Sequence, residues 1–434
     1  MHFRFFIILV VTLFNFILCQ AQLNRAIGEE LFFGSARSYA MGITHSTNAN
    51  TSSLVRYNPS LLKSISNNKI SLVDFQANLS NVNERRSILG QDSFGDYLTM
   101  MDYVNNSNSY TYFKGGLVFD ANNSITMGLS WSPLCSFNYD YIEEVRGAAT
   151  YSTGDIVIRD NLEGYHKLNS SGLTNMLSIG LSYSIVDNKD QFNFGFGFHA
   201  LRNTTIEDQF DIDSLTTELN NLSSINNYRS RPTFKNLGDY YSISSSFIND
   251  ALILSWSFEP DFLIQSSNYD PYTFIDSIGV ISYLDSTNSN FILKGLNYYK
   301  PEKWCFGISY NPKDNADMLI TAEIEFNKFY KYAYLKDAYI YRFGFEYILP
   351  SKIPIRSGLV YKQSPMHLIP DQSIITFGTG SNYRGILYDI GVSYTFLDYY
   401  YPKIFMVDGT NNDSFDKIID SKFNFVLSFR YLLK

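Results

Sequence analysis

The sequence predicts an all-β protein, a fourteen-stranded antiparallel transmembrane β-barrel with an N-terminal plug. Three observations lead to this prediction. Large apolar residues alternate with small or polar residues in segment after segment, which is typical of strands that face lipid on one side. Short and long links alternate between these segments. Charged residues make up only 18% of the 434 residues, against about 25% in soluble domains, whereas Phe, Trp and Tyr make up 17%.

Residues 1–21 have the features of a secretory signal peptide. Arg4 supplies a positive charge, residues 5–18 form an apolar run, and small residues precede a cleavage site after Ala21. The apolar run is too short for a transmembrane helix, which needs about 20 residues. We therefore predict that residues 1–21 are removed on export. A membrane anchor and a lipoprotein linked through Cys19 are the alternatives.

Residues 22–68 precede the first predicted strand and are poorly periodic. A fourteen-stranded barrel is too wide for its own side chains to fill. This segment is placed to enter the lumen from the periplasmic side, so we predict that it is a plug, with a loose periplasmic tail as the alternative. The domain organisation is then a signal peptide at 1–21, a plug at 22–68 and a barrel at 69–434.

Alternation identifies the barrel strands. In 192–198, four Phe residues alternate with Asn and Gly, and in 177–185 Leu, Ile and Tyr alternate with Ser and Gly. A soluble sandwich also alternates, but its outer face is charged rather than built of Gly, Ser, Asn and Thr. The predicted strands are 69–79, 110–119, 124–132, 173–186, 190–201, 239–248, 251–260, 292–310, 317–327, 338–349, 353–363, 371–380, 384–397 and 421–433.

The segment 292–310 sets the strand number. Pro301 cannot donate to a β-ladder, so this segment is either two strands or one strand with a bulge. Two strands would give an odd total, whereas bacterial single-chain barrels have even numbers. We therefore predict one interrupted strand. Turn formers such as Asn122-Asn123 then occupy the short links, and the long links lie at the other end.

Two parts of the chain resemble a known family. The segment GSARSYAMG, from Gly34 through Arg37 to Gly42, and the turn Tyr57-Asn58-Pro59-Ser60 are similar in order to the N-terminal segment of the long-chain fatty-acid outer-membrane transporters. The stretches 341–371 and 374–396 are similar to the strands of that family's C-terminal third. The chain departs from the family pattern at Ser60, where the family has Ala, and at Lys434, where it has an aromatic residue.

The resemblance implies passive uptake of hydrophobic molecules such as long-chain fatty acids across the outer membrane of a Gram-negative cell. Ligand would bind an outer groove, pass to a lumen pocket and leave past a moving plug. Gly34, Arg37, Gly42, Asn58 and Pro59 would form the plug motif. A related branch serves the type IX secretion system and binds exported proteins, which is the alternative function.

Two arginines and two histidines are candidate lumen residues. Arg37 could hold a carboxylate of the barrel wall or of a ligand head group, and pairing with the wall is the favoured interpretation. Arg356 alternates with Ile355 and Ser357 and is expected to point inward, where a plug-locking ion pair is again favoured. His199 and His45 are candidate lumen or plug residues, although a single histidine is more often a structural polar group.

Several functions are excluded or disfavoured. No nucleophile–base set and no His/Cys cluster with metal-ligand spacing is present, so we predict neither an enzyme nor a metal or cofactor site. The net charge of −8 argues against a nucleic-acid partner. Cys135 and Cys305 are predicted to be free. The expected partners are outer-membrane lipid and a hydrophobic ligand, and the polar loops 133–172 and 202–238 would also permit an exported protein.

Overall fold

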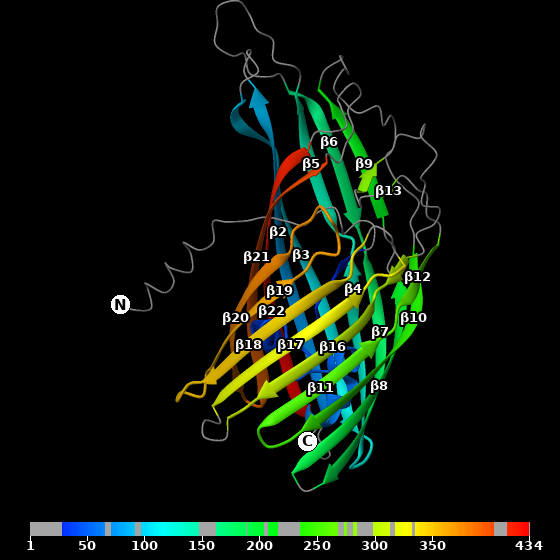
Figure 1. Ribbon diagram of the computed structural model, residues 1–434, viewed down its shortest axis with the longest axis vertical. Coiled ribbons are helices and arrows are strands. Elements are labelled where there is room, and N and C mark those ends of the chain that lie inside the picture. The colour runs from blue at the N-terminus through cyan, green and yellow to red at the C-terminus, as the bar shows by residue number, and fades with distance from the viewer. Residues whose placement is uncertain are drawn as a thin grey trace, which may run out of the picture.

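The chain forms a closed antiparallel β-barrel that carries a smaller sheet above one end (Figure 1). No helix among the described residues is long and apolar enough to cross a membrane. The computed structural model describes residues 28–65, 71–91, 97–146, 162–187, 189–203, 207–215, 235–267, 273–275, 281–283, 298–312, 317–331, 335–402 and 415–433. The predicted signal peptide therefore lies outside the described residues.

The barrel wall has fourteen strands, as predicted, and each predicted strand corresponds to one of them. The first and last strands pair with each other and close the barrel, with Ser71 opposite Leu433 at one end of their ladder. In order around the barrel the strands are β2 (Ser71–Gln91), β3 (Tyr97–Asp120), β4 (Ile125–Ser136), β7 (Leu173–Asp187), β8 (Asp190–Asn203), β10 (Lys235–Ile248), β11 (Leu252–Glu259), β16 (Glu302–Tyr310), β17 (Met318–Lys328), β18 (Ala338–Ile348), β19 (Pro354–Lys362), β20 (Gln372–Tyr383), β21 (Ile386–Pro402) and β22 (Phe415–Leu433).

The barrel strand at Pro301 is one strand with an interruption. This confirms the prediction of one strand rather than two, which was based on the even strand number of barrels. A short strand, β15 (Tyr298–Lys300), precedes Pro301 and pairs with β12 (Phe262–Ser267). Beyond the proline, β16 pairs with β11. The register is unchanged across the break, since Phe262 lies opposite Lys300 and Glu259 opposite Lys303. The earlier part of the predicted strand, 292–297, lies outside the described residues.

Several strands are longer than predicted. Links 80–109 and 398–420 were predicted as loops, but β2 and β3 continue to Gln91 and from Tyr97, and β21 and β22 extend likewise. These extensions rise above the barrel in Figure 1. One face of these extensions is buried by other parts of the chain. Tyr399 and Ile418 pack in an apolar cluster with Met366. Arg86 packs on Tyr141, and Glu84 accepts from the Tyr139 hydroxyl. Further strands in the long links are β5 (Tyr139–Arg146), β6 (Leu162–Ser171) and β9 (Glu207–Ser214), which form one sheet, and β13 (Thr273–Ile275) with β14 (Ile281–Tyr283).

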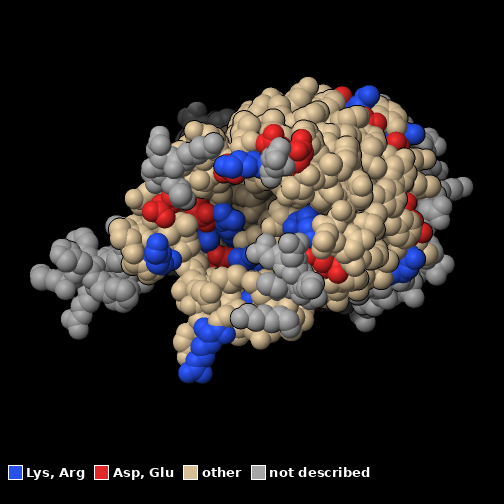
Figure 2. Space-filling model, turned by 90° about the horizontal axis from the view of Figure 1, so that it is seen from below, with Lys and Arg blue, Asp and Glu red and all other residues tan. Residues whose placement is uncertain are grey.

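The barrel wall is apolar outside and polar inside. Phe194 and Leu359 on the outer face are each 55% exposed, whereas Ser178 and Ser182 on the inner face are fully buried. Figure 2 looks onto the end with the short turns and shows charged residues gathered around a hollow, while the surrounding surface is largely uncharged. This distribution is the reverse of that in a soluble protein. An exposed apolar surface of this extent marks contact with another apolar phase.

Residues 28–65, here called the N-terminal segment, lie inside the barrel. Small wall side chains meet the backbone of the segment: Ser182 Oγ donates to the Ser60 carbonyl at 2.9 Å, and Ser428 Oγ accepts from the Ala36 amide at 3.2 Å. The small, polar inner face thus matches a segment with little regular structure, whose backbone groups need partners. Its elements are β1 (Glu29–Glu30), α3 (Ala36–Ala40), α4 (Leu54–Tyr57), the 3₁₀ helix η1 (Pro59–Leu61) and α5 (Leu62–Ile65).

A buried ion pair anchors the middle of this segment to β2 and β3. Lys114 Nζ lies 2.6 Å from Asp74 Oδ1, and both side chains are almost fully buried. The other oxygen of Asp74 accepts from the Ser52 amide at 2.6 Å, and Lys114 also donates to Thr51 Oγ1 at 3.0 Å. Because each charge has a partner, burial does not leave either group unsatisfied.

Candidate functional site in the barrel lumen

A cavity of about 300 Å³ lies between the N-terminal segment and the barrel wall. It is on the side of the long links, because its wall residues include Lys300, Leu335 and Gln372 at the upper strand ends. Part of the lining is apolar or aromatic and comes from both the segment and the wall. These residues include Leu31, Phe32, Tyr57, Ala338, Ile340 and Val360.

Charged groups stand at one side of the cavity. Glu30 Oε1 accepts from Arg56 Nη2 at 2.8 Å and from Lys303 Nζ at 2.6 Å. Burial alone would raise the pKa of Glu30, but the positive charges of Lys303, Lys300 and Arg56 outweigh it and lower that pKa below its usual value. Glu30 is therefore ionised at neutral pH, and the lining combines apolar surface with paired charges.

The two predicted arginines meet at one carboxylate that the sequence analysis did not single out. Arg37 of α3 binds Glu346 of β18 through two hydrogen bonds, 2.6 Å from Nη2 to Oε1 and 3.0 Å from Nε to Oε2. Arg356 of β19 binds the same carboxylate at 2.5 Å and Asp389 of β21 at 2.7 Å. Burial would lower the pKa of Arg37, but Glu346 outweighs it and raises that pKa. This network therefore joins the N-terminal segment to three wall strands.

The network lies away from the cavity. Glu346, Arg356 and Asp389 sit near the short-turn ends of their strands, and none of them lines the cavity. Arg37 and Arg356 are thus placed to hold the segment against the wall rather than to contact a ligand in the cavity. Their role in locking a plug stays a prediction.

His199 is hydrogen-bonded within the wall. Its Nδ1 lies 2.8 Å from Ser178 Oγ and its Nε2 lies 2.9 Å from Ser242 Oγ, and the ring packs on Tyr240 at a centroid distance of 4.5 Å. Both ring nitrogens are satisfied and the side chain is fully buried. The geometry therefore favours the structural interpretation of His199. His45, by contrast, lines the cavity.

The remaining motif residues shape the segment itself. Asn58 Nδ2 donates to the Ser46 carbonyl at 2.6 Å, and Pro59 occupies the first turn of η1, where a missing N–H costs nothing. The Gly34 carbonyl accepts from Thr51 Oγ1 at 2.8 Å. These bonds connect parts of the segment that are 12 to 17 residues apart, so the motif residues hold the segment together internally.

Gly42 is the motif residue with the strictest steric requirement. Its φ is +69°, and a Cβ there would lie 2.2 Å from the Phe343 carbonyl oxygen of the wall. Replacement by alanine is expected to destabilise the seated segment by more than the about 1–2 kcal/mol of a left-handed non-glycine residue, because the clash is with backbone. The rate at which a protease cuts the N-terminal segment in purified protein would measure this.

Gly385 provides a matched control for Gly42. It also has a positive φ, of +84°, but a Cβ there would meet nothing within 4 Å. Gly385→Ala should cost only the backbone strain and leave the segment protected. Equal protease sensitivity of the two variants would show that close approach to the wall does not restrict Gly42.

Sequence reasoning missed the carboxylates that hold the segment. Glu323 accepts from the backbone amides of His45 and Ser46 at 2.8 and 2.6 Å, and Glu346 holds the two arginines. Both occur at positions of their strands whose neighbours are apolar and outward. A charged residue at an inward position of a barrel strand was therefore the signal that could have identified them.

The fold matches solved structures over nearly its whole length. A FadL homologue from Pseudomonas aeruginosa is 12% identical, has a TM-score of 0.57, and the match covers 93% of this chain and 99% of that chain. The chain has a FadL-type fold. The toluene transporter TodX of Pseudomonas putida shares this FadL-type fold at 13% identity and a TM-score of 0.54, with 93% and 99% of the chains covered.

A third structure with this FadL-type fold is the toluene transporter TbuX of Ralstonia pickettii, at 14% identity and a TM-score of 0.51, with 93% and 99% of the chains covered. No family model matches the sequence, and no curated protein matches it. These matches confirm the fold that the resemblance implies. At sequence identities of 12–14%, they show similarity of fold.

Proposed function

We propose that the protein is an outer-membrane channel for the passive uptake of hydrophobic small molecules, with the N-terminal segment as its plug. The observation that carries the proposal is the partly apolar cavity between this segment and the wall. The apolar outer face is suited to lipid, and the secreted route fits the predicted signal peptide at 1–21. The FadL-type fold supports the same function, as two of its solved examples are toluene transporters.

The cavity volume bears on the class of ligand. A cavity of about 300 Å³ is at the lower end of the range for small-molecule pockets. A compact aromatic hydrocarbon fits such a volume more readily than an extended acyl chain. We therefore propose monoaromatic compounds as the first class of substrate, and long-chain fatty acids as a second class that needs the plug to move further.

Uptake by whole cells tests the proposal. Cells of a Gram-negative host with an intact lipopolysaccharide layer, with and without the protein, would be supplied with labelled toluene or labelled oleate. This barrier is needed because small hydrophobic compounds cross a phospholipid bilayer unaided. Faster uptake of toluene in the expressing cells is expected. Equal uptake of both compounds with and without the protein would overturn the proposal.

A cavity-filling variant ties uptake to the cavity. Ala338 lines the cavity and is 3% exposed, whereas the next residue, Tyr339, faces outward. Ala338→Trp should occupy part of the cavity and lower the uptake rate several-fold, and Tyr339→Trp in the same strand should leave it unchanged. Uptake that is insensitive to Ala338→Trp would place the route elsewhere.

The alternative function, binding of exported proteins, is not favoured by the comparisons. The loops on which it depends, 133–172 and 202–238, are only partly within the described residues. Their described parts include β5, β6 and β9, which form a three-stranded sheet above the barrel. This sheet is compatible with a role at the cell surface but does not by itself indicate a protein partner.

A further inference from the structure

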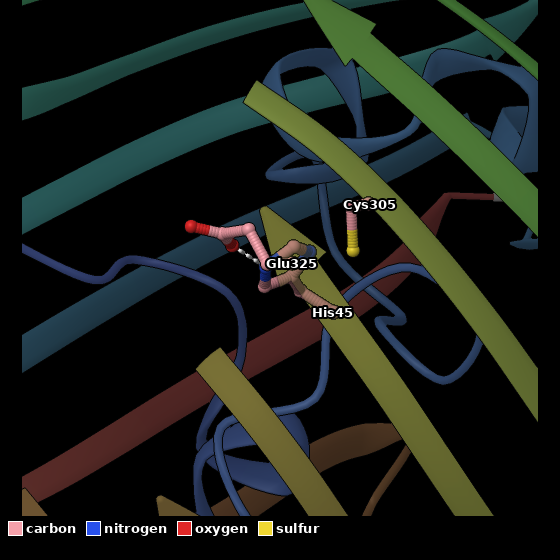
Figure 3. Close-up of side chains that lie close together, drawn as sticks. All are labelled: His45, Cys305 and Glu325. Atoms are coloured by element: carbon pink, nitrogen blue, oxygen red, sulfur yellow. Dashed lines mark ion pairs between the residues drawn. The ribbon is translucent and has the colours of Figure 1, made fainter. Parts of the chain in front are cut away.

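We propose that His45, Cys305 and Glu325 form a binding site for a divalent transition metal, with Zn²⁺ as the best-fitting ion. Their potential ligand atoms, one nitrogen, one sulfur and one oxygen, all lie within 4.8 Å of one another. In Figure 3 the His45 ring lies between the Glu325 carboxylate and the Cys305 thiol. This site goes beyond the proposed transport function and does not depend on it.

The barrel wall supplies two of the donors by its register. Cys305 in β16 lies directly opposite Glu325 in β17, so both side chains point to the same inner face. Both are buried, at 4% and 6% exposed. Because the ladder holds the two strands, this half of the site exists before any metal binds.

The third donor comes from the N-terminal segment and is firmly positioned. The His45 ring stacks on Tyr57 at a centroid distance of 4.5 Å, and the His45 amide donates to Glu323 at 2.8 Å. His45 Nε2 is 3.5 Å from Glu325 Oε2, a long contact for a hydrogen bond. The side chain is buried, yet Nδ1 has no hydrogen-bond partner among the described residues.

An unsatisfied buried ring nitrogen is a second observation that points to a ligand, because such a group is costly without a partner. Glu323 Oε2 also has no hydrogen-bond partner among the described residues, and its nearest cation is Arg342 Nη1 at 4.0 Å. Tetrahedral Zn²⁺ would place its ligand atoms about 3.3–3.7 Å apart. The ligand atoms, which lie within 4.8 Å of one another, therefore need to approach by at most about 1–1.5 Å.

The charges also favour a cation. Glu323 and Glu325 carry two negative charges, and Arg342, which donates to Glu325 at 2.8 Å, carries one positive charge. Binding of a dication with loss of the Cys305 thiol proton to solvent brings these groups to neutrality. Arg342 and Asn327, which hydrogen-bond the two Glu325 oxygens, orient the ligating carboxylate.

The donor set selects the class of metal. Imidazole, thiolate and carboxylate together suit Zn²⁺ and its borderline neighbours, whereas Mg²⁺ and Ca²⁺ prefer oxygen ligands alone. All three residues line the cavity, which gives the ion a route to the site. A bound metal would join the N-terminal segment to β16 and β17, and so would hold the segment in place.

Cobalt binding provides the test. The full-length protein, purified in detergent, stripped with a chelator and reduced, would be titrated with Co²⁺, which gives a near-ultraviolet band when a thiolate binds it. The wild type should show this band, Zn²⁺ should abolish it by displacement, and binding should weaken as the pH falls, because the thiol must lose its proton. A folded wild type without the band would overturn the proposal.

Variants identify the ligands. Cys305→Ser should lose the band and bind Zn²⁺ at least about tenfold more weakly. Cys135→Ser is the matched control, since Cys135 is also buried and free but packs in a separate apolar cluster around Leu134 and Phe137. A band that persists in Cys305→Ser, or that is lost in Cys135→Ser, would contradict the assignment.

A second variant keeps the test valid if Cys305→Ser does not fold. His45→Gln alters the N-terminal segment and leaves the barrel strands intact, and it should weaken Zn²⁺ binding by at least about tenfold. Zn²⁺ should also slow proteolysis of the segment in the wild type but not in His45→Gln. Equal Zn²⁺ affinity of His45→Gln and wild type would show that the segment supplies no ligand.

Discussion

Replacing Glu346 with glutamine is expected to unseat the N-terminal segment and to open the barrel intermittently. Glu346 is 5% exposed and holds both Arg37 and Arg356. Removal of its charge leaves Arg37 without an ionic partner and weakens the link between α3 and β18. Loss of one partner from a buried ion pair costs about 3–5 kcal/mol. We expect frequent opening events in planar bilayers, where the wild type should stay closed, and faster proteolysis of the segment.

Two variants separate this effect from a general loss of charge. Arg37→Gln should be milder than Glu346→Gln, because Glu346 would keep Arg356 and Arg356 would keep Asp389. Asp250→Asn removes the partner of Lys189 at the same end of the barrel, but this pair is exposed and should contribute little. If Glu346→Gln stayed as closed and as protease-resistant as Asp250→Asn, the network would not hold the segment.

Replacing Leu359 with arginine is expected to destabilise the folded barrel in lipid by about 2–4 kcal/mol, the range for arginine at the midplane of a barrel. Leu359 is 55% exposed on the outer face of β19 and lies near the middle of that strand. The guanidinium group would face acyl chains, which offer it no hydrogen bonds. Unfolding by guanidinium chloride from phospholipid vesicles would measure the change.

The position of the charge along the strand should decide its cost. Val186 is 64% exposed and lies next to the last residue of β7, at the short-turn end. Val186→Arg should therefore cost only about 0–1 kcal/mol, as near a membrane interface. Similar destabilisation in both variants, or none in Leu359→Arg, would mean that the apolar outer face does not contact lipid.

The strands were predictable because their signal is local. In β7, Leu177, Ile179 and Leu181 face outward, and the one serine and one glycine between them face inward. This pattern can be read from adjacent residues. The strand extensions of β2 and β3 were not predictable by the same rule. In these extensions the buried face includes charged residues such as Glu84 and Arg86, whose partners Tyr139 and Tyr141 are distant in the sequence. The local apolar pattern therefore ends although the backbone ladder continues.

The sequence identified single residues of the candidate site but not the residues that they bind. Arg37 and Arg356 were identified as residues for an ion pair, but nothing near either of them in the sequence indicated that both bind Glu346. The same holds for His45, which is 260 residues from Cys305 and 280 residues from Glu325 in the sequence. The absence of a metal motif in the sequence is therefore no guide to what the fold brings together.

The sequence alone determined which face of each strand is apolar, how many strands form the barrel and that a segment precedes these strands. These features depend on side-chain period and on the parity of hairpins, both of which are short-range properties. Only the tertiary structure decided where the N-terminal segment lies against the wall, which carboxylate its arginine binds and where the cavity remains. Those contacts depend on barrel closure and strand register, which set distances between residues that the chain order leaves far apart.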